Sequence, residues 1–456
     1  MAVQVCWVCA RVFIFLCLVP RLADISRSIP CVLEELQSRK LLQDSTDTSL
    51  LAQRLASGPV SVYHGIDPTA PSLHLGNLIG VLVLRRFQLE GHRPIALVGG
   101  ATGMVGDPSG RSEERNLLDA DTLAANLSGI RAQLEKLLDF DNNAVLVNNY
   151  DWTRNLTLIE FLRDTGKHAT VNQMVAKQSV RSRMQSDAGI SYTEFTYMLM
   201  QAYDFWWLHT NHNCELQVGG SDQWGNIAAG VDLIRRRTAT QVHGLTWPLL
   251  TRSDGTKFGK TAEGSVWLDP ERTSSYRFHQ YFMQVTDEDV GKMLLQFTML
   301  SVSEIAELVE AHQREPQHRE AQRRLAFEVT SLVHGPTQAS AAESAAKILF
   351  GSPVEKVGEA ALQAVAQEVP TSLLVRTPQG GFDAATGSFS LVDLLVDTGL
   401  ATSKGDARRG LAEGSVYVNN QRASSSAATI CGDQLLYGRY LLLRRGKRRH
   451  HLLRSH

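Results

Sequence analysis

The sequence lacks the features that mark several specialised classes of protein. It has six cysteines in 456 residues, which excludes a dense disulfide framework and favours a reducing compartment. Its 46 lysine and arginine residues against 47 aspartate and glutamate residues give a net charge of −1, so no global field would attract nucleic acid. The apolar stretch 5–20 is interrupted by Arg11 and is too short for a membrane span. We therefore expect a chain of several domains in the cytoplasm, with no membrane partner.

Residues 1–30 form a leader of uncertain status. The apolar stretch could be the core of a signal peptide, but no cleavage site with small residues is evident. The leader also lacks the Arg/Ser-rich pattern of an organellar transit peptide. Cys6 and Cys9 make one C-x-x-C pair without a second pair, so we expect no zinc site. We therefore expect the folded domains to begin at about residue 31.

The chain is organised around a strand, a loop, a helix and a second strand between residues 60 and 100. Residues 60–63 and 93–98 are short apolar runs typical of buried strands. Between them, residues 78–89 have the pattern of an amphipathic helix that ends at Gly91. In an open parallel sheet, the loop before such a helix lies at the carboxyl ends of the strands, where ligands bind.

This loop predicts a site for nucleotide phosphates. It lacks the G-x-G-x-x-G dinucleotide fingerprint and instead places His74, Gly76 and Asn77 at the first turn of the helix. Unpaired backbone N–H groups and the positive end of the helix dipole favour phosphate there, and Gly76 lets a base or ribose approach the backbone. The alternative is a plain turn punctuated by Pro68 and Pro71.

Two further glycine-rich turns follow predicted strands. Residues 99–111 include Asp107 and Arg111 and indicate a backbone bent around a ligand, with a flexible surface loop as the alternative. Residues 216–218 form another predicted strand, which leads into a glycine pair and Asp222. The Asp222 carboxylate is placed either to accept hydrogen bonds from ribose hydroxyls or to cap the following helix.

A buried helix is predicted for residues 193–209, because the segment is apolar on nearly every side. Tyr197, Gln201 and Asp204 stand at i, i+4 and i+7 and form one polar stripe. A buried polar group without a partner costs about 1–3 kcal/mol. We therefore expect the stripe to face a polar ligand pocket rather than water.

Residues 249–261 form a polar loop with two glycines. Lys257, Lys260 and Thr261 lie close together in it. The glycines would make the loop mobile enough for its lysines to contact a triphosphate as charge develops during reaction. The alternative is a solvated surface loop.

The C-terminal third has no cluster typical of catalysis. Helices are expected from the capping box at residues 301–304 to about residue 350, and the prolines and glycines of residues 351–388 indicate a linker. Two short helices, a hairpin turn and a last strand at residues 441–445 then form a compact unit whose cations suit a nucleic-acid backbone. The alternative is a solvated helix face. The expected RNA-binding residues are Lys404, Arg408, Arg409, Arg444, Arg445 and Lys447.

Together these segments predict an α/β fold with a Rossmann-like parallel sheet, followed by an all-helical domain and a small α+β RNA-binding domain. The expected boundaries are 31–248 for the catalytic domain with a helical insertion at about 151–192, 249–275 for the lysine loop and connection, 276–350 for the helical domain, 351–388 for the linker and 389–456 for the RNA-binding domain.

The sequence resembles the bacterial-type tyrosyl-tRNA synthetases, which are class I aminoacyl-tRNA synthetases. The resemblance runs from about residue 32 to the C-terminus and depends on YHGIDPTAPSLHLGNL, GGATGMVGDPSG, FTYMLMQAYD, QVGGSDQWGN and DGTKFGKT, which occur in the family's order. It implies a ligase that converts L-tyrosine and ATP, with Mg²⁺, to tyrosyl-adenylate and then charges tRNA(Tyr). It also implies a homodimer with no bound organic cofactor and no metal held by the protein.

The resemblance assigns roles to individual residues. For tyrosine, these are Tyr63 and Asp204 on the phenol, Asp107, Tyr197 and Gln201 on the ammonium group, and Gln217 and Gln223 near the carboxylate. For ATP, they are Gly65, Asp67, Gly76, Arg111, Arg115, Gly220, Asp222 and Lys260, with Asp222 on the ribose. The catalytic set is Thr69, His74, Asn77, Lys257, Lys260 and Thr261, where Thr69 and His74 meet the γ-phosphate and the lysines meet the pyrophosphate together with Arg111 and Arg115.

Three positions depart from the family pattern. Asn77 replaces the second histidine of the His-x-Gly-His signature, and its amide can still donate to a ribose or ring oxygen. Arg111 replaces a lysine and keeps the positive charge. His64 stands where many members have cysteine, beside the expected ribose site, and is expected to alter the affinity for ATP.

Two other functions fit parts of the sequence. A nucleotidylyltransferase of the same fold would use the phosphate site on a small metabolite, but it would need neither the phenol-binding pair nor the C-terminal unit. A synthetase-derived RNA-binding protein would need no catalysis, yet Asp107, Gln201 and Lys260 are all present. Pyrophosphate exchange with tyrosine separates the three functions.

Overall fold

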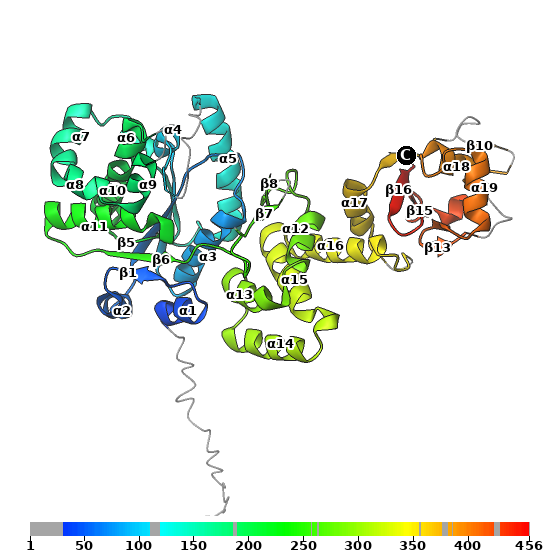
Figure 1. Ribbon diagram of the computed structural model, residues 1–456, viewed down its shortest axis with the longest axis horizontal. Helices are drawn as coiled ribbons and strands as arrows, with labels where there is room; N and C mark the ends of the chain where they lie inside the picture. Colours follow the sequence, from blue (N-terminus) through cyan, green and yellow to red (C-terminus); the bar gives the residue numbers. More distant parts are fainter. Residues whose placement is uncertain are drawn as a thin grey trace, which may run out of the picture.

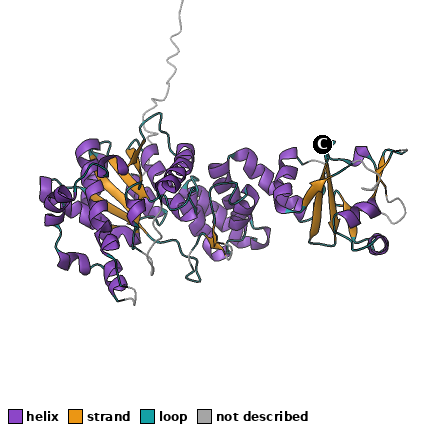
Figure 2. Ribbon diagram, turned by 90° about the horizontal axis from the view of Figure 1, so that it is seen from above, coloured by secondary structure: helices purple, strands orange, loops and turns teal. Residues whose placement is uncertain are grey.

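The computed structural model describes residues 31–109, 119–185, 189–256, 258–261, 264–354, 357–375, 382–384, 386–423 and 429–455. In Figure 1 they form three units in a row: a sheet domain, a helical domain and a C-terminal domain. Figure 2 shows the same row from above, with the larger sheets in the first and last units. The predicted leader lies outside the described residues. Within the described part of the chain, no helix has both the length and the apolar character needed to cross a membrane.

The sheet domain is built on six strands in the order β1-β6-β5-β2-β3-β4. They are β1 (Asp44–Ser45), β2 (Ser61–Ile66), β3 (Arg93–Val98), β4 (Val145–Asn148), β5 (Cys214–Gly220) and β6 (His243–Trp247). All pair in parallel except β1, which is antiparallel to β6. The chain runs outward from β2 through β3 to β4 and then returns to β5 on the other side of β2. The strand order therefore reverses between β2 and β5, which is the position where open parallel sheets bind ligands.

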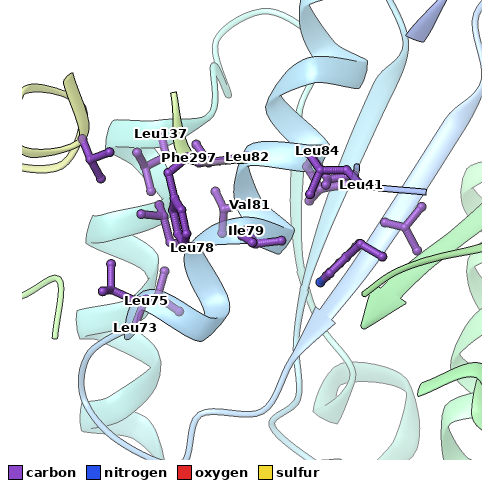
Figure 3. Packing of buried hydrophobic residues seen from close by; sticks show 14 of the residues in the cluster. Leu41, Leu73, Leu75, Leu78, Ile79, Val81, Leu82, Leu84, Leu137 and Phe297 are labelled. Atoms are coloured by element: carbon purple, nitrogen blue, oxygen red, sulfur yellow. The ribbon is translucent and has the colours of Figure 1, made fainter. Parts of the chain in front are cut away.

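Helices cover both faces of this sheet. They are α1 (Val32–Ser38), α2 (Thr48–Ala56), α3 (Leu75–Leu89), α4 (Thr102–Val105), α5 (Ala120–Leu137), α10 (Tyr192–His212) and α11 (Trp224–Thr238). Side chains alternate along β2, so that Val62 belongs to the core around α3 while Tyr63 packs against Phe205 of α10. Leu78 and Leu82 of α3 lie in the middle of the aliphatic core (Figure 3). This burial fixes the position of the N-terminus of α3 beside the sheet.

Short helices lie between β4 and α10, in the region of the predicted insertion. They are α6 (Tyr150–Thr153), α7 (Leu158–Asp164), η1 (Gly166–His168), α8 (Val171–Val175) and α9 (Gln178–Met184). The predicted buried helix is α10. Ser191 caps its start, and Asn213 follows its end in the left-handed conformation.

The helical domain follows the lysine loop, residues 249–261. The loop ends in β7 (Lys260–Thr261), which pairs with β8 (Gly264–Ser265). The helical domain consists of α12 (Ser275–Met283), α13 (Asp287–Phe297), α14 (Val302–Arg314), η3 (Pro316–His318), α15 (Glu320–His334) and α16 (Pro336–Leu349). The predicted capping box is present, with Ser301 and Glu304 each bonding the other's backbone N–H. Phe282 and Phe297 belong to the same apolar cluster as α3, so the helical domain packs directly on the sheet domain.

The segment 351–388 is more than an irregular linker, which corrects the prediction from its prolines and glycines. It contains α17 (Glu359–Glu368) and β9 (Thr371–Leu373), and β9 pairs in parallel with β16 (Arg449–Arg454). Pro370 separates the two elements. The physical reason is an apolar cluster that α17 shares with α16 and the C-terminal sheet, a long-range contact that composition does not reveal.

The C-terminal domain has two small sheets, with strand orders β13-β12-β15-β16-β9 and β10-β11-β14. Its elements are β10 (Phe382–Asp383), β11 (Ser388–Ser390), α18 (Leu391–Asp397), α19 (Lys404–Ala412), β12 (Val416–Val418), β13 (Gln421–Arg422), β14 (Thr429–Ile430), η5 (Gly432–Gln434), β15 (Tyr440–Arg445) and β16. Asn419 and Asn420 form the predicted hairpin turn with φ of 49° and 62°. The prediction of a last strand at residues 441–445 misses β16, whose Leu452 and Leu453 are buried although basic residues flank them.

Candidate active site

A cavity of about 430 Å³ opens at the carboxyl ends of β2 and β5, where the strand order reverses. The start of α3, the polar stripe of α10 and the lysine loop complete its walls. The predicted residues that line it are Tyr63, Gly65, Asp67, Thr69, His74, Gly76, Asn77, Asp107, Tyr197, Gln201, Asp204, Gln217, Gly220, Asp222 and Gln223. Residues from both halves of the sheet domain therefore meet in one site.

Asp204 is a buried carboxylate on this cavity, 3% exposed. One oxygen accepts a hydrogen bond from Trp152 Nε1 at 2.8 Å and the other accepts one from Asn149 Nδ2 at 2.9 Å. Burial raises the pKa of Asp204 to about 7, although these two hydrogen bonds act to lower it. Each oxygen retains a lone pair, so the carboxylate can still accept a hydrogen bond from a ligand.

The Tyr63 hydroxyl has no hydrogen-bond partner among the described residues, although the side chain is 1% exposed. Burial, and then the nearby charge of Asp204, raise the pKa of Tyr63 well above its ordinary value, so the phenol stays protonated and can donate. The side-chain oxygen of Gln217 is also buried without a described partner. Each such group costs about 1–3 kcal/mol. A polar ligand that supplied the missing partners would remove this cost.

Asn149 and Trp152 orient the Asp204 carboxylate, and neither is among the site residues predicted from the sequence. Asn149 accepts from the Ala101 N–H at 2.7 Å and donates to Thr102 Oγ1 at 3.0 Å as well as to Asp204, so its orientation is fixed. The Trp152 ring stacks on Trp207 with centroids 4.0 Å apart. Both residues follow the end of β4, the edge of the sheet at which ligands bind. Their position directly after a predicted strand was the signal in the sequence that could have identified them.

A hydrogen-bond network orders a second group of cavity residues. Gln223 Nε2 donates to Asp107 Oδ2 at 2.7 Å. Asn226, which the sequence analysis also misses, donates to Gln201 Oε1 and to Gln223 Oε1, each at 3.1 Å. The network therefore holds the Asp107 carboxylate and the Gln201 amide in fixed orientations.

Asp67 anchors another part of the wall. It accepts from the Tyr197 hydroxyl at 2.9 Å and from Thr102 Oγ1 at 2.8 Å. Asp67, Asp107, Asp204 and Asp222 all line the cavity, and the described lining contains neither lysine nor arginine. Because a carboxylate attracts a cation, this part of the site suits a ligand that carries an ammonium group.

The start of α3 is arranged differently from the prediction. His74 is the N-cap, and it forms a capping box with Asn77 in which each side chain accepts from the other's backbone N–H, at 3.3 and 3.1 Å. The Leu75 N–H donates to the Val266 carbonyl. Among the described residues, the Gly76 N–H is therefore the first-turn amide without a partner. A phosphate would bind to this one amide and to the helix dipole, fewer groups than expected.

The His64 ring lies against Gly80 of α3 and carries no charge. Burial lowers its pKa to about 4, and its Nδ1 lies 3.2 Å from the Val218 carbonyl oxygen. A Cβ at Gly80 would come within 2.2 Å of the His64 Nε2, so the ring depends on glycine at that position. The imidazole thus lines the cavity as a neutral group beside Trp247.

The lysine loop lies against the start of α3. Phe258 and Gly259 line the cavity, and a Cβ built on Gly259 would lie 3.2 Å from Leu75 Cβ. Lys260 and Thr261 form strand β7. The predicted residues Arg111, Arg115 and Lys257 lie outside the described residues.

The predicted RNA-binding residues fall into two groups. Arg445 makes two hydrogen bonds to Asp406, at 2.6 and 2.8 Å, and Arg444 lies over the Tyr417 ring, 3.7 Å from its centroid. These two arginines stabilise the fold of the domain. The exposed cations are Lys404, which pairs with Asp393 at 2.6 Å, Arg408, Arg409, which lies 3.8 Å from Asp406, and Lys447.

Comparison with known proteins identifies the fold and the family. The family described as tRNA synthetases class I (W and Y) matches residues 55–351, so the chain has the fold of a class I aminoacyl-tRNA synthetase. A second family, the tyrosine–tRNA ligase SYY-like C-terminal domain, matches residues 376–453. The chain belongs to the bacterial-type tyrosyl-tRNA synthetases, the tyrosine–tRNA ligases, as the sequence predicts.

Individual relatives agree with this assignment. The chain is 53% identical over 420 residues to the tyrosine–tRNA ligase of Opitutus terrae, which covers 91% of this chain and 98% of that one. It is 50% identical over 423 residues to that of Mycobacterium tuberculosis, covering 91% and 97%. The crystal structure of a C-terminally truncated Aspergillus nidulans mitochondrial tyrosyl-tRNA synthetase is similar with a TM-score of 0.64 and 33% identity, covering 70% of this chain and 94% of that one. The matches include the C-terminal domain, which the nucleotidylyltransferase alternative does not explain.

Proposed function

We propose that the chain activates L-tyrosine with ATP and Mg²⁺, releases pyrophosphate, and then transfers the tyrosyl group to the 3′ end of tRNA(Tyr). The observation that carries this proposal is the unpaired Tyr63 hydroxyl close to the buried Asp204 carboxylate. A substrate phenol would donate its proton to Asp204 and accept one from Tyr63. Phenylalanine would leave both groups buried and unpaired. Tyrosyl-tRNA synthetases are the known example of such discrimination between tyrosine and phenylalanine. The size of this preference is a property of the family and does not come from this structure.

The ammonium and carboxylate groups of the tyrosine substrate bind to the remaining polar residues of the cavity wall. The ammonium group binds Asp107, Tyr197 and Gln201, in a region whose described lining has carboxylates and no cation. The substrate carboxylate lies near Gln217 and Gln223. The Gln217 amide can turn its NH₂ group toward that carboxylate, since the oxygen and nitrogen of an amide exchange places by a simple flip.

ATP lies with its triphosphate over the start of α3. The Gly76 amide and the helix dipole bind phosphate, Thr69 and His74 meet the γ-phosphate, and Asn77 donates to the ribose or its ring oxygen. Asp222, exposed in the turn η2 (Ser221–Gln223), accepts from the ribose hydroxyls. Gly65, Asp67 and Gly220 complete the nucleotide wall.

Mg²⁺ arrives with the nucleotide in this proposal. Among the described residues, no group of three His, Cys, Asp or Glu side chains is placed to hold a metal ion. Magnesium in ATP sites is commonly bound through phosphate oxygens and one or two carboxylates, and it neutralises the charge that develops on the phosphates.

The chemistry requires positioning and electrostatic stabilisation rather than a protein nucleophile. An oxygen of the tyrosine carboxylate attacks the α-phosphorus, and the bond to the β-phosphate oxygen breaks as pyrophosphate leaves. Lys257, Lys260, Thr261, Arg111 and Arg115 stabilise the charge on the leaving pyrophosphate. A hydroxyl of the tRNA 3′ end then attacks the tyrosyl carbonyl, and AMP leaves.

The C-terminal domain binds tRNA through its exposed cations. Lys404, Arg408, Arg409 and Lys447 are exposed, whereas Arg444 and Arg445 hold the domain together. Cations that contact phosphates give an affinity that falls as salt rises. The helical domain contacts the anticodon region in this proposal, and the boundaries between domains are those predicted from the sequence except in the segment 351–388, which contains α17 and β9.

We also propose that the chain forms a homodimer in the cytoplasm. The insertion exposes large apolar side chains: Leu158 at 68%, Ile159 at 69%, Val171 at 62% and Tyr192 at 71%. Large apolar side chains that stay exposed in one region of the chain are typical of a subunit interface. Free cysteines at positions 31, 214 and 431 support a reducing compartment.

Pyrophosphate exchange tests the activation step. The purified chain is expected to exchange labelled pyrophosphate into ATP when L-tyrosine and Mg²⁺ are present, and not to do so with L-phenylalanine. Exchange with both amino acids would contradict the role of Tyr63 and Asp204. Exchange with neither would remove the activation step from the proposal and leave RNA binding alone.

A further inference from the structure

The lysine loop is tied to the helical domain at both of its ends. At the start of the loop, the Ser253 N–H donates to the Asp289 carboxylate at 3.1 and 3.2 Å, and Lys292 Nζ donates to the Thr251 carbonyl at 3.2 Å. Asp289 and Lys292 both belong to α13. The start of the loop therefore has a fixed connection to α13.

The end of the loop is held by α12 through Tyr281. The Gly259 N–H donates to Tyr281 Oη at 2.7 Å, a bond between buried atoms. Arg252, on the opposite limb of the loop, donates to the same oxygen at 3.4 Å and lies over the ring. One hydroxyl thus joins both limbs of the loop, although the Tyr281 side chain is only 8% exposed and lies outside the substrate cavity.

Phe258 adds an apolar anchor at the same place. Its ring is 6% exposed and lies 5.1 Å from the Tyr281 ring and 5.5 Å from the Phe297 ring. Phe258 and Gly259 are the two residues between Lys257 and Lys260. The contact therefore fixes the backbone between the two lysines.

The geometry of Gly259 makes its amide depend on Tyr281. Gly259 has φ of +85°, a conformation that glycine adopts readily and other residues avoid. Its position against Leu75 and Gly76 leaves little room for a side chain. A buried backbone N–H needs an acceptor, and Tyr281 Oη is the acceptor that the structure provides.

We infer that Tyr281 is a positioning residue for the activation step, acting through Gly259 to hold the backbone that leads into Lys260 against the start of α3. The inference goes beyond the proposed function, and it rests on that function for the role of Lys260. Tyr281 contacts neither substrate, so its effect should appear only where the lysines act. That step is the departure of pyrophosphate.

The test is a Tyr281→Phe variant, which removes the hydroxyl and keeps the ring. We expect kcat for pyrophosphate exchange to fall about fivefold, the effect of one net hydrogen bond. The KM for tyrosine should stay the same, and so should the rate at which preformed tyrosyl-adenylate is transferred to tRNA. Tyr276→Phe is the matched control, because Tyr276 lies on the same helix but packs against the cluster shared by α16 and α17. It should exchange at the unaltered rate.

A double-mutant cycle separates positioning from general damage to the fold. In a Lys260→Ala background, Tyr281→Phe should cause little further loss, since the lysine that it positions is already absent. The inference would be overturned if Tyr281→Phe exchanged as fast as Tyr276→Phe. It would also be overturned if the fivefold loss persisted unchanged in Lys260→Ala, or if the loss followed a lower melting temperature. If the unaltered chain showed no tyrosine-dependent pyrophosphate exchange, the proposed function would be refuted instead.

Discussion

Asp204 and Tyr63 illustrate how single residues prepare a site for a neutral, polar group. The carboxylate is buried, and its two described hydrogen bonds use one lone pair on each oxygen. The hydroxyl of Tyr63 has no described partner at all. Both residues therefore keep an unsatisfied hydrogen-bonding capacity, which destabilises the empty site and favours a ligand that restores the missing bonds.

The raised pKa of Asp204 gives a prediction for stability. An unfolded aspartate has a pKa of about 3.9, and the folded value is about 7, so between these values the native state binds more protons than the unfolded state. The contribution of Asp204 to stability therefore falls as pH rises from about 4 to 7. Asp204→Asn removes the titration, so its melting temperature relative to the unaltered chain should rise between pH 5 and pH 8.

Asp121→Asn is the control for this measurement, because Asp121 is exposed on α5. Its melting temperature should differ from that of the unaltered chain by the same amount at both pH values. A difference for Asp204→Asn that did not change with pH would contradict the raised pKa. The Asn variant should also bind tyrosine more weakly, because its amide is a poorer acceptor for a phenol than a carboxylate.

At the scale of elements, α12 stabilises the helical domain and positions the lysine loop. His279 on α12 is buried and His334 on α15 is half-buried, and each has a buried Nε2 without a described partner. Burial lowers the pKa of both imidazoles to about 4. These helices pack on each other around Phe278, whose ring meets His334 edge to face.

These histidines predict a loss of stability in mild acid. An unfolded histidine has a pKa of about 6.5, so between about pH 6.5 and 4 the unfolded state binds more protons than the native state. Stability therefore falls as pH falls through this range. Between pH 7 and pH 5, the melting temperature of His279→Leu should fall by less than that of the unaltered chain. His318→Leu, at an exposed position, should follow the unaltered chain, and equal losses in all three would refute the assignment.

At the scale of the whole molecule, the substrate cavity and the exposed C-terminal cations lie in opposite end units of the row (Figure 1). The helical domain joins them. It packs on α3 through Phe282 and Phe297, and it shares another apolar cluster with α17 and the C-terminal sheet. Glu368 of α17 also accepts hydrogen bonds from Ser274 and Arg277 at the start of α12. The C-terminal domain is therefore held by side-chain contacts as well as by its connecting segment.

Removal of residues 386–456 should spare tyrosine-dependent pyrophosphate exchange and abolish charging of tRNA(Tyr). The described lining of the cavity has no residue in this segment, whereas the exposed cations Lys404, Arg408, Arg409 and Lys447 all lie in it. An Arg408→Glu, Lys447→Glu double variant checks the same point without exposing the shared cluster. It should exchange normally and charge at least tenfold more slowly at physiological salt, since each reversed charge loses a phosphate contact. Undiminished charging by either protein would contradict the RNA role.

Much of the fold could be predicted because local patterns carried it. The apolar run of β2, the polar stripe of α10 and the glycine-rich turns after two of the strands are short-range signals, and the structure has the strands and helices they predict. The segment 351–388 shows the limit of such signals. Its prolines and glycines indicate a linker, but α17 and β9 form there because of distant partners.

The sequence alone determined which residues are available for the chemistry and roughly which element carries each, because residue type and periodicity are local properties. Only the tertiary structure decided how they are used. It placed Asn149 and Trp152 on Asp204, turned His74 and Asn77 into a cap for α3, and set the hydroxyl of Tyr281 against Gly259. Each of these outcomes joins segments, or fixes side-chain directions, that no spacing rule determines. Burial then set the pKa values, because desolvation depends on everything packed around a group.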